Sequence, residues 1–172
     1  SVIEIGVAQC HTSVFLLGHL KITNRTRRIA FVDTFAGFTD DSIRYEVEQR
    51  GKTPVAYGAF RYGEAGRFRA NLRSQGYDNF EIVKSDATKV DWSAFAPIGA
   101  VLLDIDLYKP TIEVLRGIWE HIAPGGGVVV DDCLPDTPWD GSLAAADEFA
   151  GEAGVDWVRV GNKGALFRKP RA

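Results

Sequence analysis

Two short apolar runs that each end in aspartates most constrain what this chain can fold into. The first run, residues 101–103, ends at Asp104, and the second, residues 128–130, ends at Asp131 and Asp132. Continuous apolar runs of this length are typical of strands that are covered on both faces, as in parallel sheets. We therefore predict two buried parallel strands whose last residues carry acids.

The segment between the two runs has the pattern of a helix. Apolar residues recur at helical spacing over residues 110–122, and the following Pro-Gly-Gly-Gly, residues 124–127, predicts a turn that closes the helix. The whole is a βαβ unit, in which both strands end at the same edge of the sheet. Adjacent strands lie about 5 Å apart, so we expect the acids to crowd at the edge where open α/β sheets bind ligands.

The rest of the chain repeats the alternation of strands and helices and ends in a hairpin. Further strands are predicted at residues 2–7, 29–33, 80–84, 155–160 and 165–168, and further helices at 14–20, 62–75 and 141–150. The pattern predicts a doubly wound α/β sheet, mostly parallel with a C-terminal antiparallel strand, in a single domain over residues 1–172. Residues 37–62 are polar, aromatic and glycine-rich, with a weak helical pattern at 42–50, so we expect a lid or insertion that is mobile without ligand.

Composition excludes several classes of protein. Of the 172 residues, 45% are hydrophobic and 25% charged, with a formal net charge of −3, so no basic excess suggests nucleic acid. No apolar run approaches the roughly 20 residues of a membrane span. Cys10 and Cys133 form no CxxC motif, so we expect reduced thiols and a cytoplasmic location. The chain enters its first strand directly after Ser1, which implies either removal of an initiator Met or an upstream segment.

Acids and a glycine at the ends of the first three strands suggest a nucleoside ligand. Glu4 and Gly6 lie at the first strand–helix turn, where glycine lets the backbone approach a ligand. Asp33 and Asp86 end the next two strands, where an acid accepts hydrogen bonds from ribose hydroxyls. The alternative is that these acids cap helices and turns.

The four later acids form the strongest constellation. Asp104, Asp106, Asp131 and Asp132 supply the carboxylate oxygens that Mg²⁺, Mn²⁺ and Ca²⁺ prefer. Asp104 and Asp106 would share one side of a continuing strand. The alternative interpretation is that they cap helices and fill exposed loops.

For other side chains the evidence of a role in ligand binding is weaker. His11 lies beside the first turn and could contact a ligand, whereas His19 and His121 fit structural and surface positions. A set of aromatic residues could line a substrate pocket or simply pack: Tyr57, Phe60, Tyr62 and Trp139.

Taken together, the motifs resemble one family. The segments LDIDLYKPT at 103–111, PGGGVVVDD at 124–132, GSLAAADEF at 141–149 and DTFAGF at 33–38 are similar to the macrocin O-methyltransferase family. Members of this family are class I methyltransferases with a Rossmann-like sheet. They use S-adenosylmethionine (SAM), and many methylate sugar hydroxyls of natural products. The resemblance covers nearly the whole chain from Val2 onward.

The resemblance implies a role for each acid. Glu4 and Gly6 would lie at the methionine end of SAM, Asp33 at its ribose and Asp86 at its adenine. Asp104, Asp131 and Asp132 match the family's Mg²⁺ ligands, and Asp106 matches an acid proposed as general base. The implied partner is a small molecule with a hydroxyl group, with no nucleic acid or membrane and with a possible homo-oligomer.

The first turn departs from the family pattern. Where the family usually has a second glycine, this chain has Cys10 followed by His11, and it lacks the family's helices before the first strand. These departures keep open a degenerate methyltransferase fold that only binds ligands. A nicotinamide-dependent oxidoreductase is a weaker alternative, because the chain lacks G-x-G-x-x-G. A receiver domain is disfavoured, because its acidic pair would come on the first strand.

Overall fold

The computed structural model describes residues 1–23, 25–58, 60–61 and 64–171. Tyr62, the predicted start of a helix and a predicted pocket residue, lies outside them. The strands are β1 Val2–Ile5, β2 Ile29–Asp33, β3 Glu81–Lys84, β4 Ile98–Leu103, β5 Ile122–Val130, β6 Trp157–Val160 and β7 Gly164–Arg168. The α-helices are α1 His11–Ile22, α2 Asp40–Glu48, α3 Ala65–Ser74, α4 Tyr108–Ile118 and α5 Gly141–Ala153. Short 3-10 helices are η1 Pro54–Gly58, η2 Ala87–Lys89, η3 Trp92–Phe95 and η4 Trp119–His121.

The strands form one sheet in the order β3-β2-β1-β4-β5-β7-β6. Strands β1 to β5 pair in parallel, and β7 is antiparallel to both β5 and β6. The chain winds outward from β1 in one direction and from β4 in the other, so the winding reverses between β1 and β4. The predicted doubly wound sheet with a C-terminal antiparallel strand is confirmed.

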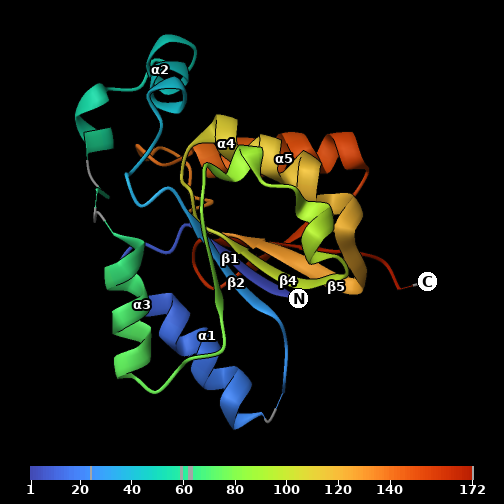
Figure 1. The fold of residues 1–172 in the computed structure, drawn as a ribbon. Helices are drawn as coiled ribbons and strands as arrows, with labels where there is room; N and C mark the ends of the chain where they lie inside the picture. Colours follow the sequence, from blue (N-terminus) through green and yellow to red (C-terminus); the bar gives the residue numbers. More distant parts are fainter. Residues whose placement is uncertain (24, 59, 62–63, 172) are drawn as a thin grey trace.

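Helices cover both faces of the sheet (Figure 1). On one face α4 and α5 pack on alternate strand residues such as Ile3 and Ile5, and on the other α1 and α3 pack around Phe31. Strands β1 and β2 are therefore buried on both faces, which explains their continuous apolar runs. Strands β4 and β5 contribute only to the first of the two clusters and have half-buried or exposed residues between their buried ones. In the part of the chain that the structure describes, no helix has the length and apolar character needed to span a bilayer.

The prediction that the Pro-Gly-Gly-Gly segment forms a turn is wrong. Helix α4 ends at Ile118, and residues 122–130 form β5 with a register shift between its Ile122 and Gly127 pairings on β4. Neighbouring strands approach so closely that a Cβ at Gly126 would lie 2.8 Å from the carbonyl oxygen of Gly99. A Cβ at Gly127 would lie 2.5 Å from the carbonyl oxygen of Phe167. These two glycines therefore permit close strand packing.

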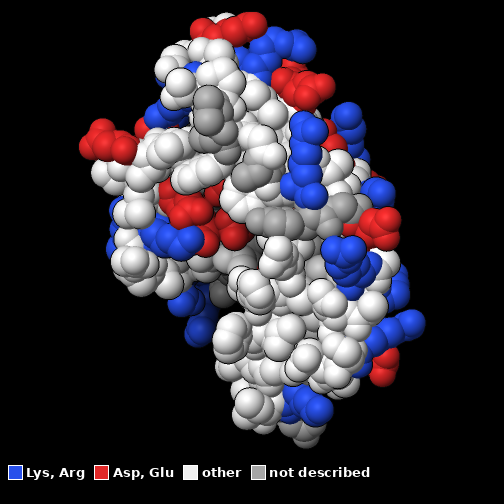
Figure 2. Space-filling view, turned by 90° about the vertical axis from the view of Figure 1, so that its left-hand side faces the viewer, with Lys and Arg blue, Asp and Glu red and all other residues white. Residues whose placement is uncertain are grey.

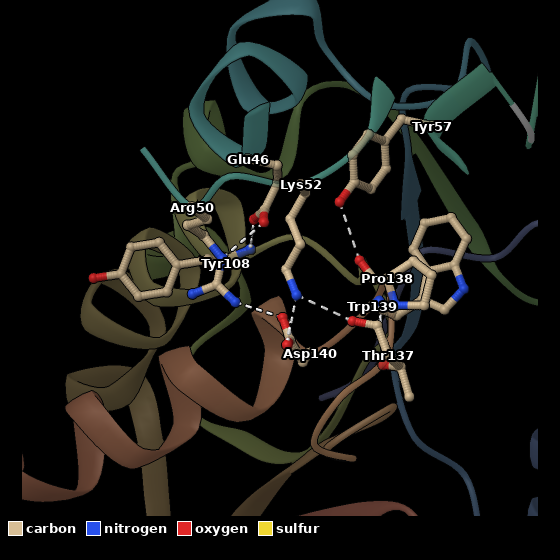
Figure 3. A network of polar contacts seen from close by, with 9 residues as sticks. All are labelled: Glu46, Arg50, Lys52, Tyr57, Tyr108, Thr137, Pro138, Trp139 and Asp140. Atoms are coloured by element: carbon tan, nitrogen blue, oxygen red, sulfur yellow. Dashed lines mark hydrogen bonds and ion pairs between the residues drawn. The ribbon is translucent and has the colours of Figure 1, made fainter. Parts of the chain in front are cut away.

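The predicted lid, residues 37–62, contains α2 and η1 and is tied to the loop before α5 by polar contacts (Figure 3). The Glu46 carboxylate is fully buried and accepts hydrogen bonds from Arg50 Nε at 2.7 Å and from the Tyr108 backbone N–H at 2.6 Å. Asp140 pairs with Arg50 and Lys52, each at 2.6 Å. This network fixes α2 against α4 and α5, and the mobility of residues 37–62 stays a prediction.

Removal of the Glu46 carboxylate should destabilise the fold. Glu46→Ala leaves the half-buried Arg50 guanidinium with Asp140 alone and the half-buried Tyr108 N–H without its acceptor, so we expect the free energy of unfolding in urea to fall by roughly 2 kcal/mol. Glu46→Gln should cost less, because its amide oxygen can still accept the Tyr108 N–H. The control is Glu48→Ala on the exposed side of α2, which should change stability by at most about 0.5 kcal/mol. Equal stabilities of the two alanine variants would contradict the role of the network.

Candidate functional site

A cavity of 320 Å³ lies at the carboxyl ends of the central strands. Figure 2 shows a hollow in the molecular surface with acidic side chains on its floor and a basic side chain beside it. Six of the eight predicted site residues line the cavity, namely Gly6, Asp33, Asp86, Asp104, Asp106 and Asp132. The sheet therefore brings together acids that end β2, β3, β4 and β5. Glu4 and Asp131 are not among the residues that line it.

The β1–α1 turn is built around Gly6 and Asp33. Gly6 has φ +83°, and a Cβ there would lie 1.8 Å from the carbonyl oxygen of Asp104. The Asp33 carboxylate accepts hydrogen bonds from the N–H of Val7 at 2.8 Å and of Phe35 at 2.6 Å. Asp33 thus serves as a turn acceptor, the alternative that the sequence left open, while it also lines the cavity.

Asp86 likewise combines a structural role with a place in the cavity. Its Oδ1 accepts hydrogen bonds from the N–H of Thr88 at 3.0 Å and from the Thr88 hydroxyl at 2.9 Å. This capping starts η2 directly after β3 and holds the Asp86 carboxyl group at the rim of the sheet.

The first turn continues through two non-glycine residues with left-handed backbone. Ala8 has φ 41° and Cys10 has φ 72°, and Cys10 caps α1 without a side-chain hydrogen bond to the helix. Left-handed backbone costs an ordinary residue roughly 1 kcal/mol, so Cys10 occupies a position that glycine would adopt without strain. His11 lines a second cavity with Arg61 and Arg67, outside the acidic one.

Glu4 lies beneath this turn and is only 1% exposed. Burial raises the pKa of Glu4 to about 8, the Ser13 hydroxyl opposes that rise, and the charges of Asp104 and Asp33 add to it. Glu4 Oε2 has no hydrogen-bond partner within the described part of the chain. The Glu4 carboxylate is therefore buried next to the cavity and is not one of its lining residues.

Three aspartates converge in the cavity. Asp104, Asp106 and Asp132 can each place one carboxylate oxygen within 4.8 Å of the other two. Burial and the nearby charges of Asp131 and Asp132 raise the pKa of Asp104 to about 7. Burial and the Asp104 charge likewise raise the pKa of Asp106 well above its usual range. Asp131 instead pairs with Lys163 at 2.9 Å.

The backbone around Asp106 is held from several sides. Asp106 has φ 59°, and its carbonyl oxygen accepts the Ser142 N–H at 3.1 Å. A Cβ at Gly141 would lie 2.4 Å from Tyr108 N, so only glycine lets α5 start this close to the Asp106 turn. Glu46 accepts the Tyr108 N–H beside this contact, since a Cβ at Gly141 would also lie 3.0 Å from Glu46 Oε1. Strained backbone that the surroundings hold in place is frequent at functional sites.

The donor set fits a hard divalent cation. Its carboxylate oxygens are the ligands that Mg²⁺ and Mn²⁺ prefer. Among the described residues that line the cavity, Lys163 is the single Lys or Arg. The acidic residues that line it are Asp33, Asp86, Asp104, Asp106 and Asp132. Burial first, and then this excess of negative charge, raise the pKa values of Asp104 and Asp106, and a divalent cation would relieve the repulsion.

The aromatic candidates divide between packing and pocket. Tyr57 is 1% exposed, donates a hydrogen bond to the carbonyl oxygen of Pro138 at 3.1 Å and packs edge-to-face on Trp139. Phe38 and Phe60 line the cavity and pack on each other. Phe38 was not singled out from the sequence although it lies in the DTFAGF segment, and Lys163 was missed because no pattern distinguishes it from an ordinary loop residue.

Comparison with known proteins places these features among methyltransferases. A family model described as "Methyltransferase domain" matches residues 3–133. The chain is 25% identical, over 89% of its length, to "8-demethyl-8-(2,3-dimethoxy-alpha-L-rhamnosyl)-tetracenomycin-C 4'-O-methyltransferase" of Streptomyces olivaceus. It is 23% identical, over 98% of its length, to "Mycinamicin III 3''-O-methyltransferase" of Micromonospora griseorubida. It spans 59% of the first relative and 68% of the second.

A solved structure shows the same fold. The O-methyltransferase NovP has a TM-score of 0.78 to this chain at 18% identity, with 99% of this chain and 72% of that chain covered.

Binding of a divalent cation should release protons from the aspartate cluster. At pH 7 Asp104 and Asp106 are partly protonated, because their pKa values are raised. A cation favours the ionised carboxylates and lowers both values. We expect roughly one proton released per Mg²⁺ at pH 7 and almost none at pH 9, where both groups are already ionised.

Calorimetric titration with Mg²⁺ in buffers of different ionisation enthalpy measures this release. Asp106→Asn should lower it, and Asp136→Asn, at an exposed position in the same loop as Asp132, should leave it unchanged. Equal proton release at pH 7 and pH 9 would show that the cluster is already ionised without the cation.

Proposed function

The chain belongs to the methyltransferase domain family and has its Rossmann-like class I fold; from that premise we propose that it methylates a hydroxyl group of a small molecule with SAM as methyl donor. The observation that carries the proposal is the single cavity that collects Asp33, Asp86 and the aspartate cluster. The two relatives are named as O-methyltransferases, one of them for a rhamnosyl compound. We therefore propose a sugar of a natural product as the acceptor.

The residues proposed to hold SAM are Glu4, Gly6, Asp33 and Asp86. Asp33 would accept hydrogen bonds from the ribose hydroxyls and Asp86 would lie at the adenine, while Gly6, which packs on the Asp104 carbonyl oxygen, would hold the first turn at the methionine end. When bound, SAM supplies a methyl group on a positively charged sulfur, which is already activated for transfer. The acids at the strand ends then have mainly to bind and orient it.

The residues proposed to hold Mg²⁺ are Asp104, Asp131 and Asp132. When bound, the cation supplies a positive charge that lowers the pKa of the acceptor hydroxyl. Asp106 lies within the same group of carboxylates and would accept the hydroxyl proton. Its raised pKa suits a base that works near neutral pH, because a carboxylate with a pKa near 4 would be a weaker proton acceptor.

One observation favours a second candidate, a methyltransferase fold that binds ligands without catalysis. Cys10 holds the left-handed position in the first turn, where its Cβ would stand close to the methionine end of SAM. Single-turnover methyl transfer separates the two candidates, because both would bind S-adenosylhomocysteine and only the enzyme would transfer the methyl group. A titration with NAD⁺ tests the oxidoreductase alternative.

We expect S-adenosylhomocysteine to bind and NAD⁺ not to bind in calorimetric titrations. Asp33→Ala should weaken S-adenosylhomocysteine by about 1–3 kcal/mol, since buried partners lose a hydrogen-bond acceptor. The control is Asp136→Ala, which changes an exposed acid outside the proposed site. Unchanged affinity in Asp33→Ala would remove Asp33 from the cofactor site, and binding of NAD⁺ alone would refute the methyltransferase proposal.

The proposed base should be essential for methyl transfer. In single-turnover assays with labelled SAM and a panel of L-rhamnosides, Asp106→Asn should lower the rate by about 10²–10⁴-fold while S-adenosylhomocysteine still binds. In Asp132→Asn, by contrast, raised Mg²⁺ should restore part of the rate, because that variant loses a cation ligand. EDTA should abolish the wild-type reaction. An undiminished rate in EDTA would rule out the cation, and partial rescue of Asp106→Asn by Mg²⁺ would make Asp106 a ligand.

A further inference from the structure

Lys163 reaches into the acidic cavity from the hairpin between β6 and β7. Its ammonium lies 2.9 Å from Asp131 Oδ2 and 2.8 Å from Asp132 Oδ1. The backbones are tied as well, because the Cys133 N–H donates to the carbonyl oxygen of Lys163 at 2.7 Å. Arg159, on β6, donates to the carbonyl oxygen of Cys133 at 2.6 Å. These contacts fix the hairpin beside the two aspartates, so Lys163 is positioned by its backbone as well as by its ion pairs.

The ion pairs of Lys163 overlap with the candidate cation site. Asp132 belongs to the convergent group with Asp104 and Asp106, and its Oδ1 also binds the ammonium. A divalent cation held by Asp132 would therefore stand within a few ångströms of a positive charge that is part of the chain. Two cations so close repel each other, and solvent screens the repulsion only in part because the Lys163 side chain is 40% exposed.

We propose that Lys163 is an internal competitor of the divalent cation: it neutralises Asp131 and Asp132 while no cation is bound, and it leaves both carboxylates when the cation enters. The proposal rests on the proposed cation site and adds a determinant of its affinity. The ammonium keeps the acidic edge stable without a cation, at the expense of weaker cation binding. The ammonium donates a hydrogen bond to Asp132 Oδ1 and pairs with Asp131 Oδ2, and these contacts favour its charged form.

The test compares Mn²⁺ binding by wild type and Lys163→Met, followed by the electron paramagnetic resonance signal of free Mn²⁺ at constant pH and ionic strength. Loss of the competing charge should lower the Kd for Mn²⁺ roughly tenfold. The control is Lys21→Met, which removes the same charge from an exposed position near the end of α1 and should leave the Kd unchanged. An equal or higher Kd in Lys163→Met overturns the proposal, as does the absence of Mn²⁺ binding in both proteins.

Thermal unfolding gives a second readout that is independent of activity. In EDTA, Lys163→Met should melt at a lower temperature than wild type, because its acids have lost their neutralising ammonium. Saturating Mn²⁺ should remove that difference. A variant that matches wild type in EDTA would overturn the proposed role in the cation-free protein.

A crystal structure of wild type with Mn²⁺ tests the competition between Lys163 and the cation even if Lys163→Met fails to fold. The distance from Lys163 Nζ to Asp132 Oδ1 should lengthen beyond hydrogen-bonding range, and an unbroken contact with Mn²⁺ bound would overturn the competition. Titration of the same wild-type sample with S-adenosylhomocysteine tests the methyltransferase proposal separately. Absence of that ligand's binding would refute the enzyme, while the Mn²⁺ comparison would still decide the role of Lys163.

Discussion

Uncompensated negative charge at one edge of the sheet is the constraint on which the rest of the site depends. Adjacent parallel strands end at the same edge of a sheet, and here β4 and β5 are followed by Asp104 and by Asp131 and Asp132, of which Asp104 and Asp132 line the partly buried cavity. Carboxylates in such a place repel one another and lose hydration, and the raised pKa values of Asp104 and Asp106 express both effects. Lys163 supplies part of the missing charge, and a divalent cation is proposed to supply the rest.

The scaffold around these acids is strained and tightly braced. Asp106 and Asp132 both have left-handed backbone, with φ of 59° and 52°. The start of α5 at Gly141 packs closely on the Asp106 turn, and the buried Glu46 carboxylate accepts a hydrogen bond from the Tyr108 N–H just after that turn. Such bracing matters for a base that must meet an acceptor oxygen, because small errors of position are costly in catalysis. The network of α2 therefore connects the predicted lid to the residue that is proposed to do the chemistry.

The first turn and the aspartate cluster meet at the point where the winding of the sheet reverses. Gly6 packs directly on the carbonyl oxygen of Asp104, so the proposed cofactor end and the proposed cation end share a backbone contact. Asp33 ties the same turn to β2 through the N–H of Val7. A methyl donor and an acceptor hydroxyl brought to this edge would lie side by side, as direct transfer between them requires.

The sequence by itself determined the alternation of strands and helices and the acids at the ends of β2 to β5, because local patterns of hydrophobicity mark where each strand stops and the acids follow directly in the sequence. Strand Ile29–Asp33 was predicted to the residue, and six of the eight predicted site residues do line one cavity. The sequence misassigned residues 124–127, since glycines that permit close strand packing look the same as glycines that make a turn. Only the tertiary structure decided that Asp106 joins Asp104 and Asp132, and that Asp131 pairs with Lys163. It alone also revealed Glu46 as the brace of Tyr108 across 62 residues of sequence. Such contacts join side chains from distant elements, and no local pattern records which charged residue will meet which.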